Sequence, residues 1–342
     1  MCVAGPLPTR GTSLGYAAGV TSSAPASTAA ASSRTSNPLA ALSGHPVLAA
    51  VLGAMAIAFS AILVREANVA PATAAIFRCL YALPPLALLA WLERRAYGPR
   101  PWSQRRLALL AGVFFAIDLV VWHHTIAYVG AGLATVLGNT QVLLVAIIAW
   151  LVLGEKPSRR LLASIPIALL GVVLISGVVG ARPYGKDPML GVVTGVVTGI
   201  TYACFILLLR RGNADLRRPA GPLFDATLVG AIASLLIGLP LGEVNLVPTW
   251  PAHLWLVLLA LSSQVVGWLL ISVSLPRLPA ALTSVVLTVQ PVASVLLAML
   301  LLREAPSPIQ LLGAAAILAG LMLATLRRPG ERAGVVGDPE LN

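Results

Sequence analysis

The chain alternates between long apolar runs and short polar connections. A helix rises about 1.5 Å per residue, so roughly 20 apolar residues are needed to cross the hydrocarbon core of a bilayer. Strands of a membrane barrel would instead show short segments of alternating polarity. The pattern therefore predicts an all-α membrane protein with ten transmembrane helices, at Pro46–Val64, Ala72–Leu92, Leu107–Val129, Gly132–Leu153, Leu161–Val179, Met189–Leu209, Leu223–Leu241, His253–Leu275, Ala280–Leu302 and Ile309–Leu326.

Composition argues against a water-soluble protein. Hydrophobic residues make up 58% of the 342 residues and charged residues 10%, whereas soluble domains carry about 25% charged residues. A chain this apolar needs lipid as its solvent, where helices satisfy their backbone N–H and C=O groups internally. Residues 1–45 and 327–342 lie outside the apolar runs, and we expect them to be a disordered N-terminal extension and a disordered C-terminal tail.

The net charge of +11 reflects how basic residues are divided between the two membrane faces. With both termini in the cytoplasm, 18 of the 23 Lys and Arg residues flank the inner face and 4 flank the outer face. This asymmetry follows the positive-inside rule and predicts a multi-pass protein of the cell membrane, with anionic lipids at its cytoplasmic face. The basic residues form no face with interleaved aromatics, so no nucleic-acid partner is expected. The Ser- and Thr-rich N-terminal segment leaves an organelle membrane as the weaker alternative.

Sequence motifs give no support to catalysis. The three cysteines, Cys2, Cys79 and Cys204, form neither a CxxC pair nor a metal-ligand spacing. The sequence also has no HExxH, GxSxG or P-loop motif. We therefore expect no enzyme activity, no metal and no cofactor. A membrane-embedded enzyme and a channel or receptor are the alternatives to a transporter.

An internal repeat emerges when the sequence is shifted by 149 residues against itself. Leu153–Ser158 (LGEKPS) then falls on Leu302–Ser307 (LREAPS), and Gln141 falls on Gln290. The shift carries five spans, and an odd number makes the second copy enter the membrane from the opposite side. Inverted repeats are the architecture of many secondary transporters, which expose a midplane site alternately to each side. We therefore expect two inverted-topology five-helix repeats, at residues 46–180 and 188–326.

Three motifs resemble the EamA-type branch of the drug/metabolite transporter superfamily. They are IFRCLYALPPL at Ile76–Leu86, FFAIDLVVW at Phe114–Trp122, and the span that contains Gly138–Val142 and ends at Leu151–Lys156, with its echo from Gln290 to Glu304. The resemblance covers about Pro46 to Leu326. It implies an EamA-like fold of two units that transports a small organic compound, and it leaves the compound unspecified.

Two ionisable side chains lie deep within predicted spans. A charge at the bilayer centre costs at least about 2.5 kcal/mol, so each needs a partner or a function. Asp118 is near the middle of its span, and Arg78 lies at a depth that its long side chain can bridge. We expect the two to pair across a central substrate site, with Asp118 also a candidate for proton coupling. The alternatives are a carboxylate locked to a neighbouring helix and an arginine that only reaches the interface.

The repeat does not duplicate this chemistry. The 149-residue shift places Thr227 on Arg78 and Gly267 on Asp118. Residues that break the repeat are therefore better candidates for specificity than residues that keep it. Six further residues are candidates for the substrate site, with interhelical hydrogen bonding or interfacial anchoring as the alternatives: Trp122, Asn139, Gln141, Tyr202, Gln264 and Gln290.

Other polar residues are expected nearer the membrane faces. His123 and His124 are predicted at the solvated outer interface, and His123 is also a candidate for sensing or coupling to protons. Asp225 is predicted at the cytoplasmic interface. Glu155 and Glu304 match in the repeat but fall at opposite faces, so they are interpreted as helix-end or loop residues.

These patterns favour a secondary transporter of a small organic metabolite or drug. Transport would proceed by alternating access, in efflux or exchange. The expected partners are a small-molecule substrate and the lipid bilayer, and the sequence leaves a homodimer open. Saturation and counterflow in vesicles would distinguish such a protein from a channel.

Overall fold

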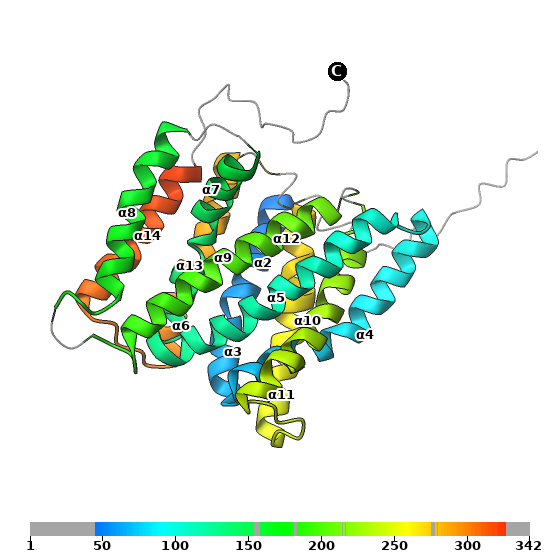
Figure 1. Ribbon diagram of the computed structural model, residues 1–342, viewed down its shortest axis with the longest axis horizontal. Helices are drawn as coiled ribbons and strands as arrows, with labels where there is room; N and C mark the ends of the chain where they lie inside the picture. The colour runs from blue at the N-terminus through cyan, green and yellow to red at the C-terminus, as the bar shows by residue number, and fades with distance from the viewer. Residues whose placement is uncertain are drawn as a thin grey trace, which may run out of the picture. The chain divides into compact units, whose positions relative to one another are not determined.

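The computed structural model describes residues 45–325, except for short gaps at 154–157, 181–182, 214, 216, 275–277 and 279. Every regular element in this part of the chain is a helix (Figure 1). The helices are α2 (Pro46–Ala58), α3 (Ser60–Ala67), α4 (Pro71–Tyr97), α5 (Trp102–Val129), α6 (Ala131–Gly138), α7 (Gln141–Leu153), α8 (Arg159–Ile175), α9 (Pro188–Gly212), α10 (Ala220–Leu241), α11 (Trp250–Leu259), η1 (Ala260–Gly267), α12 (Trp268–Ser274), α13 (Ala280–Leu301) and α14 (Pro308–Thr325).

Seven helical segments in these described ranges are long and apolar enough to cross a membrane. Two of them join several elements, since α2 runs into α3, and α11 runs through η1 into α12. Shorter apolar helices lie at Ala131–Val145 and Thr288–Leu301. The all-helical membrane class is therefore confirmed, whereas the number of ten spans stays a prediction.

The outward faces of these helices are apolar. Leu88, Leu169, Leu236 and Leu300 are each more than half exposed. Water would penalise so much exposed leucine, but hydrocarbon does not. This surface fits a protein whose solvent is lipid.

Three of the predicted spans are interrupted. The first, Pro46–Val64, is divided at Phe59 into α2 and α3. The predicted span Gly132–Leu153 is divided into α6 and α7. At the break, the Thr140 hydroxyl donates to the Leu137 carbonyl at 2.6 Å and the Asn139 amide donates to the Thr135 carbonyl at 2.8 Å. Such side chains offer the backbone groups an alternative partner and loosen the helix.

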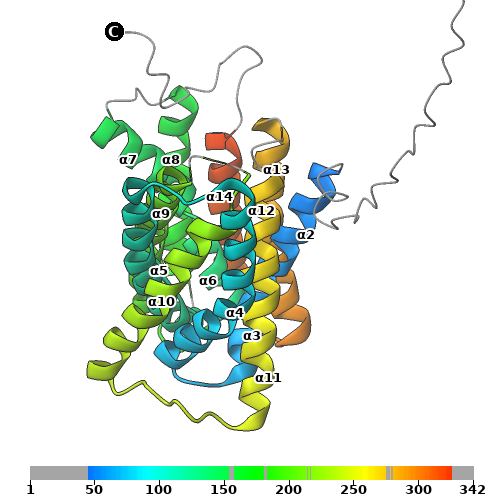
Figure 2. The same cartoon turned by 90° about the vertical axis from the view of Figure 1, so that its right-hand side faces the viewer.

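The third interruption is the π-helical segment η1. It lies between α11 and α12, and the three elements run on as one long column in Figure 2. A π-helix is an uncommon conformation that recurs at functional sites. Here it carries Ser263 and Gln264, which are both fully buried.

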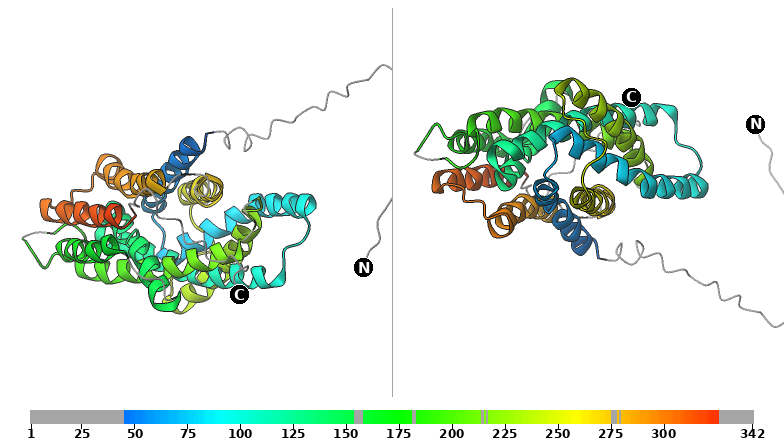
Figure 3. Two further views of the ribbon diagram at one scale, coloured as in Figure 1. Left: turned by 90° about the horizontal axis from the view of Figure 1, so that it is seen from above. Right: turned by 90° about the horizontal axis from the view of Figure 1, so that it is seen from below.

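Helices α8 and α14 lie side by side and contact through small residues (Figure 3). A Cβ atom on Gly313 would lie 2.7 Å from the Gly171 carbonyl oxygen, and one on Gly320 would lie 3.1 Å from the Ser164 carbonyl oxygen. The numbering rises along one helix as it falls along the other, so the helices are antiparallel. Ser164 and Gly313 are 149 residues apart, and so are Gly171 and Gly320.

We expect Gly313→Leu to destabilise the protein strongly. The backbones of α8 and α14 already touch at this point, so a leucine would force them apart. Thermal unfolding in detergent should show a lower midpoint by at least several degrees. Ala315→Leu is the matched control, because Ala315 is exposed on the same helix. Equal stability of both variants would show that this contact does not hold the helices together.

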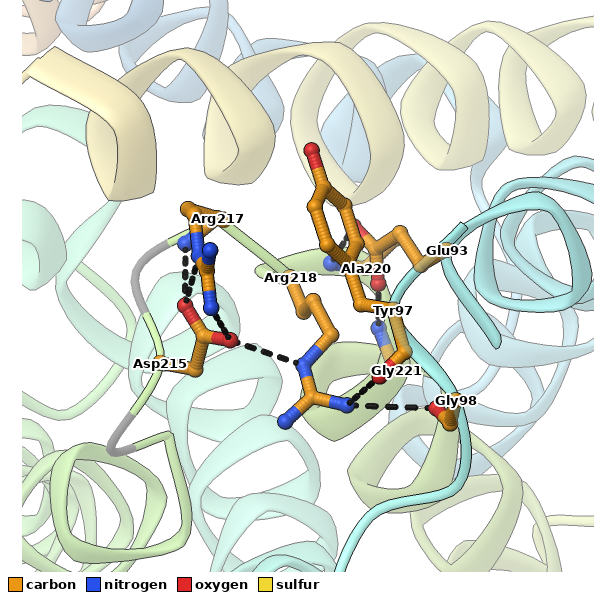
Figure 4. A network of polar contacts seen from close by, with 8 residues as sticks. All are labelled: Glu93, Tyr97, Gly98, Asp215, Arg217, Arg218, Ala220 and Gly221. Carbon is orange, nitrogen blue, oxygen red and sulfur yellow. Dashed lines mark hydrogen bonds and ion pairs between the residues drawn. The ribbon is translucent and has the colours of Figure 1, made fainter. Parts of the chain in front are cut away.

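Glutamate side chains tie the start of one helix to the end of another. Glu93, near the end of α4, accepts hydrogen bonds from the backbone N–H groups of Ala220 and Gly221 at 2.8 Å each (Figure 4). Glu243, just after α10, accepts one from the N–H of Ala72 at 3.1 Å. The first N–H groups of a helix have no partner within the helix, and its dipole favours an anion there. Because each helix is capped by the far end of the other, α4 and α10 are antiparallel.

A third glutamate acts in the same way. The carboxylate of Glu304 accepts hydrogen bonds from the N–H groups of Ala131 at 2.7 Å and Gly132 at 3.2 Å, at the start of α6. Burial raises the pKa of Glu304, and these two donors oppose that increase. The interpretation of Glu304 as a helix-end residue is confirmed. Its repeat partner Glu155 lies outside the described residues.

Candidate functional site

A cavity between the helices brings together residues from both halves of the sequence. Helices α2 to α6 line it from the first half, and α9, α12 and α13 line it from the second. Its volume is about 50 Å³. Six residues named from the sequence line it: Arg78, Asp118, Trp122, Asn139, Tyr202 and Gln290.

Asp118 is the acidic group of this cavity. It comes from the middle of α5, and only 6% of its surface is exposed. One carboxylate oxygen, Oδ1, is buried without any hydrogen-bond partner among the described residues. A buried acceptor without a partner costs free energy, so its position needs an explanation beyond packing.

Arg78 is held in place by the π-helical segment. Its Nε donates to Oε1 of Gln264 and its Nη2 donates to the Ser263 hydroxyl, both at 3.2 Å. Gln264 in turn donates from Nε2 to the Thr227 hydroxyl at 3.1 Å. The guanidinium carbon also lies 5.8 Å from the ring centroid of Trp122, within the range of a cation–π contact. Among the described residues, the two acceptors that bind Arg78, Gln264 and Ser263, are neutral.

The expected ion pair between Arg78 and Asp118 is not formed. Both residues line the cavity, but no ion pair within 4 Å joins them in the described part of the chain. The side chains of Gln264 and Ser263 bind the guanidinium instead. The sequence gives the approximate depth of each residue in its span, but not the direction in which η1 presents its polar side chains. It therefore could not reveal that Gln264 and Ser263 bind the guanidinium of Arg78.

Four polar residues of the cavity were missed from the sequence: Ser60, Thr135, Thr198 and Trp268. The hydroxyl of Thr198 and the indole Nε1 of Trp268 are buried without a partner among the described residues. The Trp268 ring makes edge contacts with Tyr202 and Phe205, at centroid distances of 6.2 and 5.3 Å. A signal was available for Trp268, since it directly follows Gly267, the repeat counterpart of Asp118.

Three other candidates lie away from the cavity lining. Gln264 forms a second layer behind Arg78. Gln141 is buried at the start of α7 and is not among the described residues that line the cavity. His123 is 2% exposed, and its Nδ1 lies 2.9 Å from the Pro71 carbonyl oxygen. The prediction of a solvated His123 at the interface was wrong, because the start of α4 packs over this part of α5.

Asp225 lies near the start of α10 and is not among the described residues that line the cavity. It is 2% exposed and forms ion pairs with Arg100 and, at 3.4 Å, with Arg105. These arginines precede and begin α5, so the contact ties the start of α5 to the start of α10. The sequence placed the charges on the same membrane face but could not show that they meet.

Comparison with known proteins identifies the family. The model of the EamA-like transporter family matches residues 45–177 and 189–326, which is most of the chain. The chain belongs to the EamA-like transporter family. The resemblance seen in the sequence is therefore confirmed, and this EamA-like protein is a multi-pass membrane transporter of small metabolites.

Individual relatives agree with this assignment. The threonine/homoserine exporter RhtA of Escherichia coli K12 is 28% identical over 263 residues, which is 72% of this chain and 79% of RhtA. The uncharacterized transporter sll1319 of Synechocystis is 25% identical over 279 residues, covering 76% of this chain and 80% of its own length. One solved structure matches with a TM-score of 0.55 at 17% identity, over 82% of this chain and 96% of that one, which shows a shared fold alone.

Proposed function

We propose that this EamA-like protein is a secondary transporter of the cell membrane that moves a small polar metabolite by alternating access. Its two repeats, residues 46–180 and 188–326, would form ten spans in inverted topology with both termini in the cytoplasm. One observation carries the proposal: a cavity between the two halves is lined by two buried ionisable side chains, Arg78 and Asp118, that form no direct ion pair in the described part of the chain. Buried charge at this depth is costly and marks substrate pathways.

The packing supports the inverted arrangement. Helices α4 and α10 are repeat counterparts, since Ala72 shifted by 149 residues falls on Gly221. They cap each other through Glu93 and Glu243, so the equivalent helices of the two copies run in opposite directions. Helices α8 and α14 are also counterparts and are likewise antiparallel.

Two sets of polar contacts stand at opposite ends of α4 and α10. The inner latch consists of the hydrogen bond from the backbone N–H of Ala220, at the start of α10, to Glu93, together with the Arg100–Asp225 ion pair. Arg218 adds to it, because its guanidinium donates to the Tyr97 and Gly98 carbonyls, as Figure 4 shows. The outer latch consists of the hydrogen bond from the N–H of Ala72, at the start of α4, to Glu243, together with the contact between the Glu243 carboxylate and Nε2 of His124 at 3.1 Å.

The cavity is smaller than a typical substrate site. Small-molecule sites commonly have volumes of ~300 Å³ or more, whereas this cavity has about 50 Å³. Entry of a substrate therefore requires the helices to separate at one latch while the other holds. Opening the latches in turn is alternating access.

Export is the direction we propose. RhtA is named as an exporter of threonine and homoserine, and a small polar substrate suits the polar lining of this cavity. We further propose that Asp118, Arg78, Trp122, Asn139, Tyr202 and Gln290 contact the substrate, with Asp118 also carrying a coupling proton. The basic inner face would bind anionic lipid headgroups.

We expect purified protein in vesicles to show saturable counterflow, and Asp118→Asn to reduce it at least tenfold. The substitution keeps the shape of the side chain but removes the charge that faces the cavity. Asp187→Asn is the matched control, because Asp187 caps the start of α9 away from the cavity and asparagine caps helices about equally well.

The same assay separates the alternatives. A channel would give flux that does not saturate and no counterflow. An enzyme would convert its substrate, which analysis of the vesicle contents would reveal. If no compound in a panel of amino acids, amines, sugars and nucleosides shows counterflow, the proposed function is wrong.

A further inference from the structure

A pocket distinct from the central cavity lies beside the inner latch, and we call it the inner pocket. It has a volume of about 270 Å³ and is lined by the end of α4, the connection to α5, the start of α5 and the start of α10. Six of its described lining residues are charged: Arg94, Arg100, Arg105, Arg218, Glu93 and Asp225. Four cations against two anions give the lining an excess of positive charge, which attracts an anion.

Both acidic groups of this lining already have partners. Asp225 forms ion pairs with Arg100 and, at 3.4 Å, with Arg105. Glu93 accepts hydrogen bonds from two backbone N–H groups at the start of α10, as Figure 4 shows. A ligand with an ammonium group would have to displace these partners, whereas an anion would not. The inner pocket therefore favours a ligand whose net charge is negative.

Arg94 and Arg105 are the cations that such a ligand can reach. Arg94 is exposed, and its side chain forms no ion pair in the described part of the chain. The Arg105 side chain is 44% exposed, and it shares its partner Asp225 with Arg100. A guanidinium group matches the oxygens of a phosphate with two parallel hydrogen bonds. Two such groups in the lining of one pocket suit a phosphate.

Neighbouring charges do not cancel this excess. Asp215, which is outside the lining, pairs with Arg218 at 3.1 Å, but it also pairs with Arg217 at 2.9 Å. Arg95 adds a further cation close to the pocket, since its guanidinium carbon lies 3.8 Å from the ring centroid of the lining residue Trp91.

The inner pocket continues from this basic end to an apolar end. Ala87, Ala90 and Phe224 also line it. Ala87 precedes Arg94 on α4 by seven residues, or about 10 Å in the direction of the hydrocarbon core. Trp91 lies between these two positions and is 46% exposed, and tryptophan is typical of the headgroup level of a membrane. A ligand with a charged head and an apolar body fits this arrangement.

We propose that the inner pocket is a specific site for one anionic phospholipid of the cytoplasmic leaflet. Its phosphate binds the guanidinium groups of Arg94 and Arg105, and the first part of its acyl chains lies along Ala87, Ala90 and Phe224. Basic pockets between membrane helices bind such headgroups. This goes beyond a general attraction of lipid to the basic inner face, because one lipid is held at defined groups. Only the choice of leaflet rests on the proposed orientation of the transporter.

Native mass spectrometry of the purified full-length protein, titrated with lipid in detergent, measures this binding. The lipid probes are dioleoyl phosphatidylglycerol, which is anionic, and dioleoyl phosphatidylethanolamine, whose ammonium group balances its phosphate. We expect the first phosphatidylglycerol to bind at least fivefold more tightly than the first phosphatidylethanolamine. Glycerol 3-phosphate and inorganic phosphate carry the anion without the acyl chains, so a tenfold excess of either should displace less than half of the bound phosphatidylglycerol.

Variants of the arginines test the basic end. The double variant Arg94→Gln/Arg105→Gln should weaken the first phosphatidylglycerol at least tenfold and remove its preference over phosphatidylethanolamine. Arg94→Gln alone changes an exposed residue and keeps the Arg105–Asp225 contact, and it should weaken binding at least threefold. Arg210→Gln/Arg211→Gln is the matched control, because it removes two exposed arginines at the end of α9 that are not among the lining residues. It should keep the preference.

A second pair of variants tests the apolar end. Ala87→Leu places extra volume in the pocket and should weaken phosphatidylglycerol at least fivefold. Leu88→Phe is the control, because Leu88 is exposed at the next position of α4 and is not among the lining residues. It should leave binding as in the parent protein.

The alternatives give different results. Equal losses in the two double variants would show a diffuse attraction to the basic face and overturn the specific site. Displacement of most of the lipid by glycerol 3-phosphate or inorganic phosphate would show a site for a soluble anion and overturn the lipid. Unchanged binding in Ala87→Leu would overturn the placement of the acyl chains. None of these measurements involves transport, so a failed lipid site leaves the counterflow test standing, and absent counterflow leaves the lipid site standing.

Discussion

Replacing Gln264 with leucine is expected to destabilise the folded protein by about 3 kcal/mol. The variant would leave the buried Arg78 without its Oε1 acceptor and Thr227 without its amide donor. A buried polar group that loses its partner costs about 1–3 kcal/mol, and more when it is charged. Reversible unfolding in detergent, followed by circular dichroism or by intrinsic tryptophan fluorescence, measures the change.

A double variant tests the cause of this loss. Arg78→Met combined with Gln264→Leu removes both the charge and its acceptor, so most of the stability should return although transport stays lost. Val266→Leu, an exposed position on the same π-helical segment, serves as the control and should be nearly neutral. If Gln264→Leu alone is as stable as the parent protein, the guanidinium does not depend on η1.

The sequence predicts the spans because lipid imposes a simple requirement on them. Long apolar runs and the excess of basic residues on one side are properties of local composition, which can be counted without a structure. The interruptions at Asn139 and in η1 are different. They depend on where single side chains find hydrogen-bond partners, and periodicity does not record this.

The residues of the candidate site likewise fall into those that could be found from the sequence and those that could not. Asp118 and Arg78 could be found from the sequence because a charge in hydrocarbon is conspicuous. Thr198 could not, because threonine is ordinary in membrane helices and becomes informative only when its hydroxyl is buried without a partner among the described residues. Trp268 could be found only through its place beside Gly267, the repeat counterpart of Asp118. The absence of the Arg78–Asp118 ion pair likewise depends on the rotation of η1, which is set by its packing against α2 and α4.

The glutamate caps show how a charge can be interpreted correctly but incompletely. The repeat of Glu155 and Glu304 indicated residues at helix ends. It could not show that Glu304 binds the start of α6, because that contact joins residues more than 170 positions apart. Glu93 and Glu243 gave no signal at all, since they lie beyond the aligned motifs.

Breaking the two latches one at a time is expected to open the cavity to opposite sides of the membrane. A cysteine at Ser60, which lines the cavity and is 2% exposed, reports access in a background without native cysteines. Glu243→Gln should increase its labelling by an impermeant thiol reagent from outside, and Glu93→Gln should increase it from inside, each at least tenfold. A hydrogen bond to a charged group contributes about 1.5–3 kcal/mol, and about 1.4 kcal/mol already shifts a population tenfold.

The direction of the effect is the decisive result. Both substitutions remove the same charge from the start of a helix, so a general loosening of the fold would raise labelling equally from both sides. Glu66→Gln, at an exposed position near the end of α3, controls for the change of charge and should leave labelling as in the parent. Opposite directions follow only if α4 and α10 present their capped ends to opposite faces. Labelling from the same side in both variants would contradict the inverted arrangement and the alternating access that depends on it.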